Sequence, residues 1–217
     1  MQASPQTYLA DVTAEMSKAW PGNRMVEIVC HGHSVPAGYA VTPDVKTLDA
    51  YPNLLRVGLS HRFPMAVINV TVTAIGGENS IQGEKRFAKD VVARHPDVVT
   101  IDYGLNDRGI DPAAVRTAWQ SMITQAKNAR IKVILLTPTG DLTAKMDDPN
   151  DPLVKQAVAI RLLAKEQNVG LVDSFAFFKN AVDSGTKLET LMAQVNHPNR
   201  TGHELVAAGL LEWFPHP

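Results

Sequence analysis

Short runs of Val, Ile and Leu alternate along this chain with longer stretches in which apolar residues recur at helical spacing. The apolar runs are nearly continuous, as is typical of strands buried on both faces of a parallel sheet. They predict strands at Met25–Cys30, Ala66–Thr73, Asp97–Tyr103, Ile131–Thr137 and Val169–Asp173. Strands that alternate with helices favour an α/β fold, with a five-stranded parallel sheet and helices on both faces.

The stretches between these strands predict helices, some with recognisable starts. Asp111 and Pro112 are suited to be the N-cap and first residue of the third helix. Thr201-Gly202-His203-Glu204 has the pattern of a capping box that opens the last helix. The other helices are expected at Leu48–Arg62, Glu84–His95 and Pro152–Glu166, and the last at Glu204–Trp213. Residues 1–24 are expected to form an N-terminal helix and its connection to the first strand.

Composition narrows the class of protein. A chain of 217 residues fits one domain, 1–217, and its net charge of −1 without blocks of like charge gives no sign of a nucleic-acid partner. Cys30 is the only cysteine, which excludes an intrachain disulfide and a cysteine-based metal site. We expect no membrane span and no signal peptide, hence a soluble protein, either cytoplasmic or a mature exported form. The sequence does not specify an oligomeric state.

Chemistry-bearing residues follow the ends of several predicted strands. Ser34 follows the first strand, Gly77 the second and Asn106 the third, while His197 lies between the fifth strand and the last helix. Ligands of an open parallel sheet collect beyond the carboxyl ends of its strands, so these segments are expected at one edge. A serine becomes nucleophilic when a histidine takes its proton, and the two intervening segments can donate hydrogen bonds to an oxyanion. The arrangement predicts a serine esterase.

Three other interpretations fit less well. Gly32-His33-Ser34-Val35-Pro36 resembles a nucleophile elbow, but Pro36 occupies the required glycine and only one strand precedes Ser34. The acidic turn 147–151 fails the spacing of a calcium-binding loop. His31 and His33 could form a metal pair, but no third ligand is evident, so we expect a solvated loop there and no metal or other cofactor.

Four ordered blocks resemble the SGNH hydrolases, also called GDSL esterases and lipases. The blocks are Gly32-His33-Ser34, Ile75-Gly76-Gly77-Glu78-Asn79-Ser80, Gly104-Leu105-Asn106-Asp107 and His197-Pro198-Asn199 with Gly202-His203. The resemblance implies a three-layer flavodoxin-like α/β fold and ester hydrolysis by Ser34 through an acyl-enzyme. It also implies an oxyanion hole made by the backbone N–H groups of Ser34 and Gly77 and the side-chain amide of Asn106.

The chain departs from the family pattern at two positions. The usual aspartate three residues before the histidine is Gln194, and the usual aspartate before the serine is His33. We interpret the catalytic group as a Ser34–His197 dyad. The amide oxygen of Gln194 is a candidate to accept the His197 N–H and orient the ring; another carboxylate or a backbone carbonyl is the alternative. His33 is expected to be structural.

The substrate is the least specified part of the prediction. We expect a small-molecule or glycan ester with a short acyl group, such as acetyl on a carbohydrate. The alternatives are a lipase, lysophospholipase or thioesterase activity, a degenerate module that binds glycan without cleaving it, or a flavodoxin-like nucleotide-binding module. A nucleotide-binding module would require a phosphate-binding loop after the first strand, and residues 31–39 match such a loop poorly.

Overall fold

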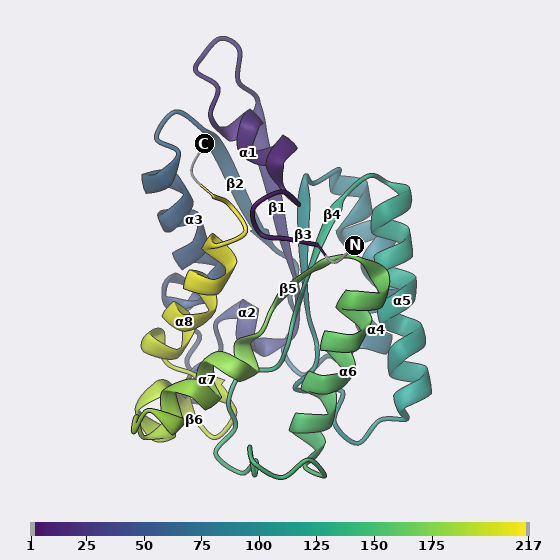
Figure 1. Ribbon diagram of the computed structural model, residues 1–217, viewed down its shortest axis with the longest axis vertical. Helices are drawn as coiled ribbons and strands as arrows, with labels where there is room; N and C mark the ends of the chain where they lie inside the picture. Colours follow the sequence, from purple (N-terminus) through teal and green to yellow (C-terminus); the bar gives the residue numbers. More distant parts are fainter. Residues whose placement is uncertain (1–2, 216–217) are drawn as a thin grey trace.

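A five-stranded parallel sheet forms the centre of the computed structural model, which describes residues 3–215 (Figure 1). The strand order is β2-β1-β3-β4-β5, and each neighbouring pair is parallel. The strands are β1 (Met25–Gly32), β2 (Val67–Val72), β3 (Val98–Asp102), β4 (Lys132–Leu136) and β5 (Gly170–Val172). The expectation of an α/β fold built on five parallel strands is therefore confirmed.

Helices cover both faces of the sheet and give the molecule three layers (Figure 1). One face carries α1 (Ala10–Met16), α3 (Tyr51–Arg62) and α8 (Arg200–Leu211). The other face carries α4 (Ser80–Asp90), α5 (Pro112–Asn128) and α6 (Pro152–Gln167). Short 3-10 turns add Thr47–Asp49, Val92–Arg94 and Leu188–Leu191. No helix within residues 3–215 is both long and apolar enough to cross a bilayer.

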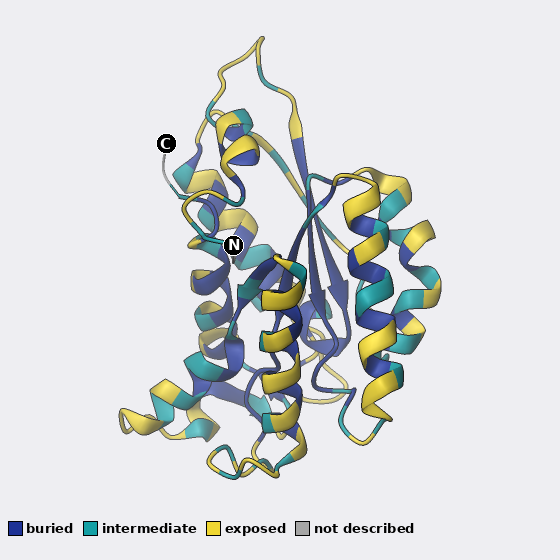
Figure 2. Ribbon diagram, turned by 45° about the vertical axis from the view of Figure 1, so that its right-hand side comes forward, coloured by how far each residue is buried: buried dark blue, intermediate teal, exposed yellow. Residues whose placement is uncertain are grey.

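The alternation of side chains along each strand divides the core into two clusters. In β1, Ile28 and Cys30 pack with the helices of one face, whereas Val29 packs with those of the other. Successive side chains of a strand point to opposite faces, so a central strand that is covered on both faces is apolar at most positions. Figure 2 shows the result: most of the sheet is buried, and the outer helices expose one side.

Three helices begin at residues other than those expected. The first begins at Tyr51, not Leu48, because residues 47–49 form a separate 3-10 turn. The second helix begins at Ser80, not Glu84, because Asn79 accepts hydrogen bonds from the N–H groups of Ile81 and Gln82 and the Gln82 side chain completes a capping box. The last helix is not opened by Thr201: Asn199 is its N-cap and accepts the Gly202 N–H at 3.1 Å. The cap on the third helix is confirmed, since Asp111 accepts from Ala113 and Ala114.

Between β5 and α8 the chain forms elements that the apolar pattern does not predict. Asp173 is not the end of a strand but the N-cap of helix α7 (Ser174–Asp183). A small antiparallel sheet follows, made of β6 (Met192–Gln194) and β7 (His197–Pro198). In Figure 1, β6 and the short helix α2 (Ser34–Ala37) lie toward the lower edge, where the parallel strands end. This second sheet brings His197 toward the segment that follows β1.

Candidate active site

Ser34 begins helix α2, two residues after β1 ends, in a segment with little room for larger residues. A Cβ on Gly32 would lie 2.5 Å from the Asp102 carbonyl oxygen, closer than real side chains approach. His33 fixes the start of the helix because its Nδ1 accepts the Val35 N–H at 3.1 Å. Gly38 ends the helix with a φ of 90°, a left-handed conformation that favours glycine. The Ser34 side chain is thereby held at the carboxyl edge of the sheet.

The side chains of Ser34 and His197 meet across the sequence. His197 Nε2 lies 2.9 Å from Ser34 Oγ, within ordinary hydrogen-bond distance. Both residues are buried, with 6% and 8% of their surface exposed. Burial lowers the pKa of His197 below its ordinary 6.5, an effect that a hydrogen bond to the Ala40 carbonyl partly opposes. The neutral imidazole, the charge state that a general base requires, is therefore the main form at pH 7.

The other ring nitrogen of His197 has two neighbours. Nδ1 lies 3.1 Å from the carbonyl oxygen of Ala40 and 2.8 Å from Nε2 of Gln194. No Asp or Glu within residues 3–215 hydrogen-bonds to this ring. Of these two neighbours only the Ala40 backbone carbonyl can accept a ring N–H, and a backbone carbonyl is the alternative raised by the sequence. A backbone carbonyl is present in every residue, so the sequence can suggest this kind of acceptor but cannot say which residue supplies it.

The expected contact between His197 and the Gln194 amide oxygen is wrong. That oxygen instead accepts the backbone N–H of Thr42 at 3.0 Å and the Thr42 hydroxyl at 3.3 Å. The orientation of an amide must be inferred from its network, and a backbone N–H is an unambiguous donor. The atom that faces His197 is therefore the amide nitrogen.

Gly77 occupies a tight turn after β2. The Glu78 N–H bonds to the Ile75 carbonyl at 3.3 Å, and Gly77 has a φ of 81°, as the third residue of a type II turn requires. A Cβ there would meet nothing within 4 Å, so glycine is favoured at this position by the backbone conformation and not by a lack of space. No hydrogen bond found within residues 3–215 uses the N–H of Ser34 or of Gly77. Both N–H groups are free to bind an oxyanion.

Asn106 follows β3 and is tied to the same turn. Its Nδ2 donates to the Glu78 carbonyl at 2.8 Å, which leaves the second amide hydrogen for another acceptor. Because β1 lies between β2 and β3, the Gly77 turn and the Asn106 loop flank the segment that carries Ser34. The four predicted residues thus gather at one edge: a hydrogen bond joins Ser34 to His197, and another joins Asn106 to the glycine turn.

The residues that match a known family are now placed in space. The sequence profile described as the GDSL-like lipase/acylhydrolase family matches residues 30–205, most of the chain. The chain belongs to the GDSL-like lipase/acylhydrolase family. It is accordingly a carboxylic ester hydrolase, as the sequence predicts. A comparison with curated protein sequences gave no significant match.

Solved structures agree with the fold. Axe2, an acetylxylan esterase from Geobacillus stearothermophilus, superposes with a TM-score of 0.75 at 23% identity, covering 88% of this chain and 95% of that one. A protein of the G-D-S-L family from Desulfitobacterium hafniense DCB-2 gives a TM-score of 0.70 at 22% identity, covering 87% and 99%. The three-layer arrangement is therefore that of known SGNH esterases.

The sequence analysis assigned no role to Asp107, but in the structure this residue joins two segments of the site. Its two carboxylate oxygens accept the Ser80 N–H at 2.9 Å and the Trp119 indole N–H at 2.8 Å. Burial raises the pKa of Asp107 above its ordinary 3.8, and the two donors oppose the rise. The carboxyl group joins the start of α4 to the loop that carries Asn106. The feature of the sequence that could have identified Asp107 is its position next to Asn106 in the Gly104–Asp107 block.

His33 is buried directly before Ser34. Its Nδ1 accepts the Val35 N–H, so its Nε2 carries the proton; Nε2 lies 3.4 Å from Asp102 Oδ1 without forming a hydrogen bond. Tyr51 donates its hydroxyl to the other oxygen of Asp102 at 3.3 Å. The expected structural role of His33 agrees with these contacts.

Other singled-out residues serve the fold. His31 is not on a solvated loop, as expected, but is buried in β1, where Nδ1 lies 2.8 Å from Thr73 Oγ1 and burial lowers its pKa to about 3. His203 accepts the Tyr51 N–H, and burial lowers its pKa to about 4. Arg108, which directly follows the Gly104–Asp107 block, forms an ion pair with Asp141 at 2.8 Å. Among residues 3–215 there is no cluster of three acidic, His or Cys side chains suited to a metal ion.

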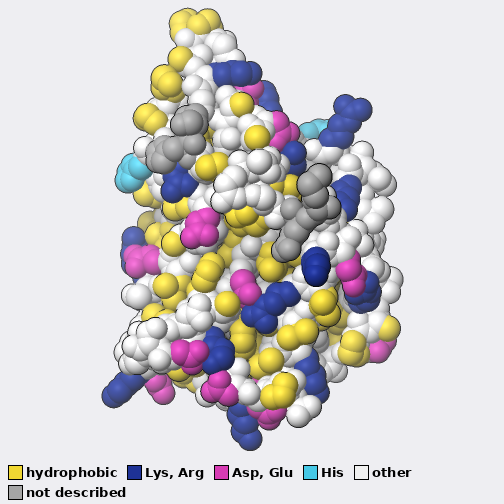
Figure 3. Space-filling model, in the orientation of Figure 1, with side chains coloured by type: hydrophobic (Ala, Val, Ile, Leu, Met, Phe, Trp, Pro, Cys, Tyr) yellow, Lys and Arg dark blue, Asp and Glu magenta, His cyan; other side chains and the backbone are white. Residues whose placement is uncertain are grey.

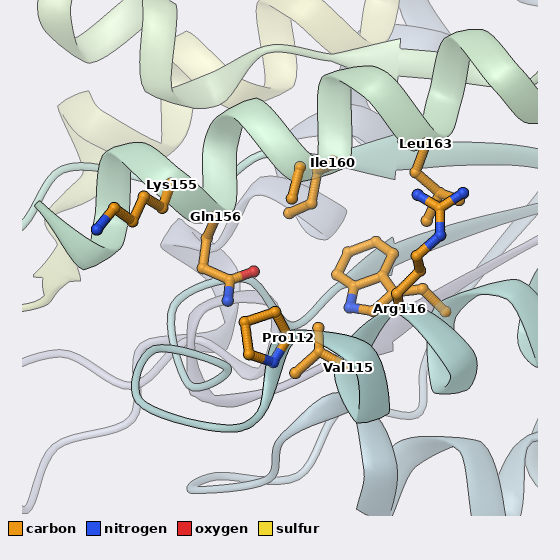
Figure 4. A pocket seen from close by; sticks show the side chains of 9 residues that line it. Pro112, Val115, Arg116, Lys155, Gln156, Ile160 and Leu163 are labelled. Carbon is orange, nitrogen blue, oxygen red and sulfur yellow. The ribbon is translucent and has the colours of Figure 1, made fainter. Parts of the chain in front are cut away.

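An apolar pocket of about 200 Å³ lies between α5 and α6, and its lining does not include Ser34 or His197 (Figure 4). Val115 and Ile160 face it from the two helices, with Lys155 and Arg116 at its ends. On the face shown in Figure 3, positive and negative side chains are interspersed, with no large area of one sign.

Proposed function

We propose that Ser34 and His197 hydrolyse esters through an acyl-enzyme. The observation that carries the proposal is the 2.9 Å contact between Ser34 Oγ and His197 Nε2. His197 Nε2 accepts the serine proton while Oγ attacks the ester carbonyl. The backbone N–H groups of Ser34 and Gly77 and the Asn106 amide then donate to the oxyanion. His197 returns the proton to the leaving alcohol, and it activates the water that releases the acid.

The proposed substrate is a short acyl ester, such as acetyl carried on a carbohydrate. Axe2, which has the same fold, is described as an acetylxylan esterase, and a second description of that enzyme names acetyl-xylooligosaccharides. Structures of Axe2 in which a serine, a histidine or an aspartate is replaced by alanine are described as catalytic mutants. The serine and histidine have their proposed counterparts here in Ser34 and His197, and the aspartate has none.

Tyr39 supports a carbohydrate as the alcohol portion. Its ring centre lies 6.0 Å from that of His197, and a Cβ on Gly76 would come within 2.8 Å of the tyrosine ring. The side chain is nevertheless 39% exposed, so a flat aromatic surface faces solvent beside the dyad. An aromatic ring with a polar tip suits a ligand that has both apolar faces and hydroxyl groups.

The test is covalent labelling together with turnover. A fluorophosphonate probe should label the wild-type protein and p-nitrophenyl acetate should be hydrolysed, whereas Ser34→Ala should show neither and keep the wild-type circular dichroism spectrum. Labelling at another residue, or turnover that survives in Ser34→Ala, would exclude the mechanism.

Substrate length and alcohol are tested separately. Turnover should fall as the acyl chain is lengthened from acetyl, and acetylated xylooligosaccharides should give a higher kcat/KM than p-nitrophenyl acetate. Tyr39→Ala should raise KM for the sugar ester more than for the p-nitrophenyl ester. A preference for long acyl chains would favour the lipase alternative, and saturable sugar binding without turnover would favour the non-catalytic one.

A further inference from the structure

The tautomer of His197 decides whether the dyad can act. To accept the Ser34 proton, Nε2 must be unprotonated, so the ring proton must sit on Nδ1. In the opposite tautomer Nε2 carries the proton and points it at Ser34 Oγ, and no base is available. The two groups beside Nδ1 therefore affect catalysis by favouring one or the other position of the ring proton.

These two groups favour opposite tautomers. The Ala40 carbonyl, 3.1 Å away, can only accept, so it stabilises the competent form with a proton on Nδ1. The Gln194 amide nitrogen, 2.8 Å away, can only donate, so it stabilises the form in which Nδ1 is bare. When the ring is protonated during catalysis, the Nδ1 proton faces an acceptor and a donor together.

The amide is held in this orientation from its far end. Its oxygen accepts both the backbone N–H and the hydroxyl of Thr42. Turning the amide would place its NH2 group against the Thr42 backbone N–H, two donors face to face, and would lose that bond; only the hydroxyl could turn and accept instead. Thr42 thus fixes which atom Gln194 presents to His197.

We propose that Gln194, oriented by Thr42, is a positioning residue that restrains the dyad by favouring the unreactive tautomer of His197, and that the Ala40 carbonyl is the group that favours the reactive one. The proposal deepens the proposed function and rests on Ser34–His197 catalysis for its effect on rate. It reverses the role expected from the sequence, in which Gln194 helps the histidine.

The decisive variant is Gln194→Glu, which has the same shape as the native side chain. One carboxylate oxygen keeps the Thr42 bonds while the other takes the place of the amide nitrogen and accepts the Nδ1 proton. A shorter aspartate would have to move the backbone to make the same contact. We expect kcat to rise about tenfold or more, since a triad carboxylate supports up to ~10⁴ in kcat elsewhere.

Two further variants separate the parts of the argument. Gln194→Leu removes the donor and leaves the Ala40 carbonyl alone, so the competent tautomer should gain population. Thr42→Val is the matched control: it removes the weaker 3.3 Å bond but keeps the backbone N–H, and it should change the tautomer little.

The tautomer can be read without turnover, by ¹⁵N NMR of histidine-labelled protein, with His197 assigned by its loss in His197→Ala. Wild type should show a population with bare Nδ1, and both Gln194 variants should shift His197 toward protonated Nδ1. In Gln194→Glu the acid limb of kcat/KM should also move to higher pH, because the carboxylate stabilises the imidazolium. The tautomer shift in Gln194→Leu, which adds no charge, is the readout that a merely structural Gln194 would not produce.

The other titratable neighbours of His197 stay constant across these variants. They are His33 before α2, Tyr39 after it and His203 on α8. A wild-type ring already fully protonated at Nδ1, unchanged in Gln194→Leu, would overturn the proposal. If the tautomer shifts as expected but no variant hydrolyses an ester and Ser34 is not labelled, the proposed function fails while the tautomer assignment stands.

Discussion

Replacing Asn106 by alanine separates the oxyanion role of this side chain from its contribution to the fold. Loss of one oxyanion-hole donor costs about 10²–10³ in kcat, or about 2.7–4 kcal/mol of transition-state stabilisation. The same change removes the 2.8 Å bond from Asn106 Nδ2 to the Glu78 carbonyl. A neutral hydrogen bond contributes about 0.5–1.5 kcal/mol to folding, so the expected fall in Tm is only about 1–6 °C.

The chain offers a matched control for the structural part. Asn53 Nδ2 also donates to a backbone carbonyl, that of Leu48, at 2.8 Å. Asn53→Ala should therefore lower Tm by a similar amount and leave kcat unchanged. Asn106→Asp is a second probe: it keeps the shape but replaces the donor by an oxygen that repels an oxyanion, so kcat should fall at least as far as in Asn106→Ala.

The assay is steady-state hydrolysis of p-nitrophenyl acetate, with thermal unfolding of each variant measured in the same buffer. The expected pattern is a large fall in kcat for Asn106→Ala at an almost unchanged KM. A raised KM with kcat unchanged would make Asn106 a uniform binding contact and refute the oxyanion assignment. A loss of kcat in proportion to the unfolded fraction would refute it as well.

Three further outcomes follow from the site. Because burial lowers the pKa of His197 and its neutral form is the base, kcat/KM should fall on acidification with a midpoint below pH 6.5; a midpoint above 6.5 would contradict this. His197→Ala should cost on the order of 10⁴ or more in kcat, whereas Gln194→Ala, which removes the restraining donor, should not lower kcat; equal losses in folded variants would make Gln194 an essential third member. Asp107→Ala should destabilise the fold by about 1–3 kcal/mol, measured by urea unfolding, because it strands the buried N–H groups of Ser80 and Trp119; an unchanged midpoint would contradict the anchoring role.

The sequence predicts the sheet because its strands must be apolar on both faces, and that pattern has few other causes. A run such as Ile28-Val29-Cys30 lacks the helical period of apolar and polar residues, and its segment is too short for a buried helix. Helix starts are harder to predict, since several polar residues compete for one cap. Asn199 and Thr201 both suit an N-cap, and only the path of the β6–β7 sheet decides in favour of Asn199.

Within the site, reactive side chains can be predicted from the sequence, whereas the backbone groups that contact them cannot. Ser34 and His197 are identified by residue type and by their place at strand ends, and the structure places them 2.9 Å apart. The Ala40 carbonyl is invisible because every residue has one, and its position depends on the connection after α2. The Gln194 orientation is equally hidden, because it is set by the backbone N–H of Thr42, 152 residues away along the chain.

The two departures from the family pattern change the charge around the dyad in the same direction. Neither Gln194 nor His33 brings a carboxylate to the site, and the buried Asp102 accepts the Tyr51 hydroxyl and does not hydrogen-bond to His197. Attack of Ser34 creates an imidazolium and an oxyanion together. Since the imidazolium is stabilised only by the Ala40 dipole, more of the stabilisation of this charge pair must come from the oxyanion side. If Ser34 and His197 act as proposed, we expect the Gly77 turn, Asn106 and the Asp107 anchor that joins their segments to carry a larger share of catalysis than they would beside a full triad.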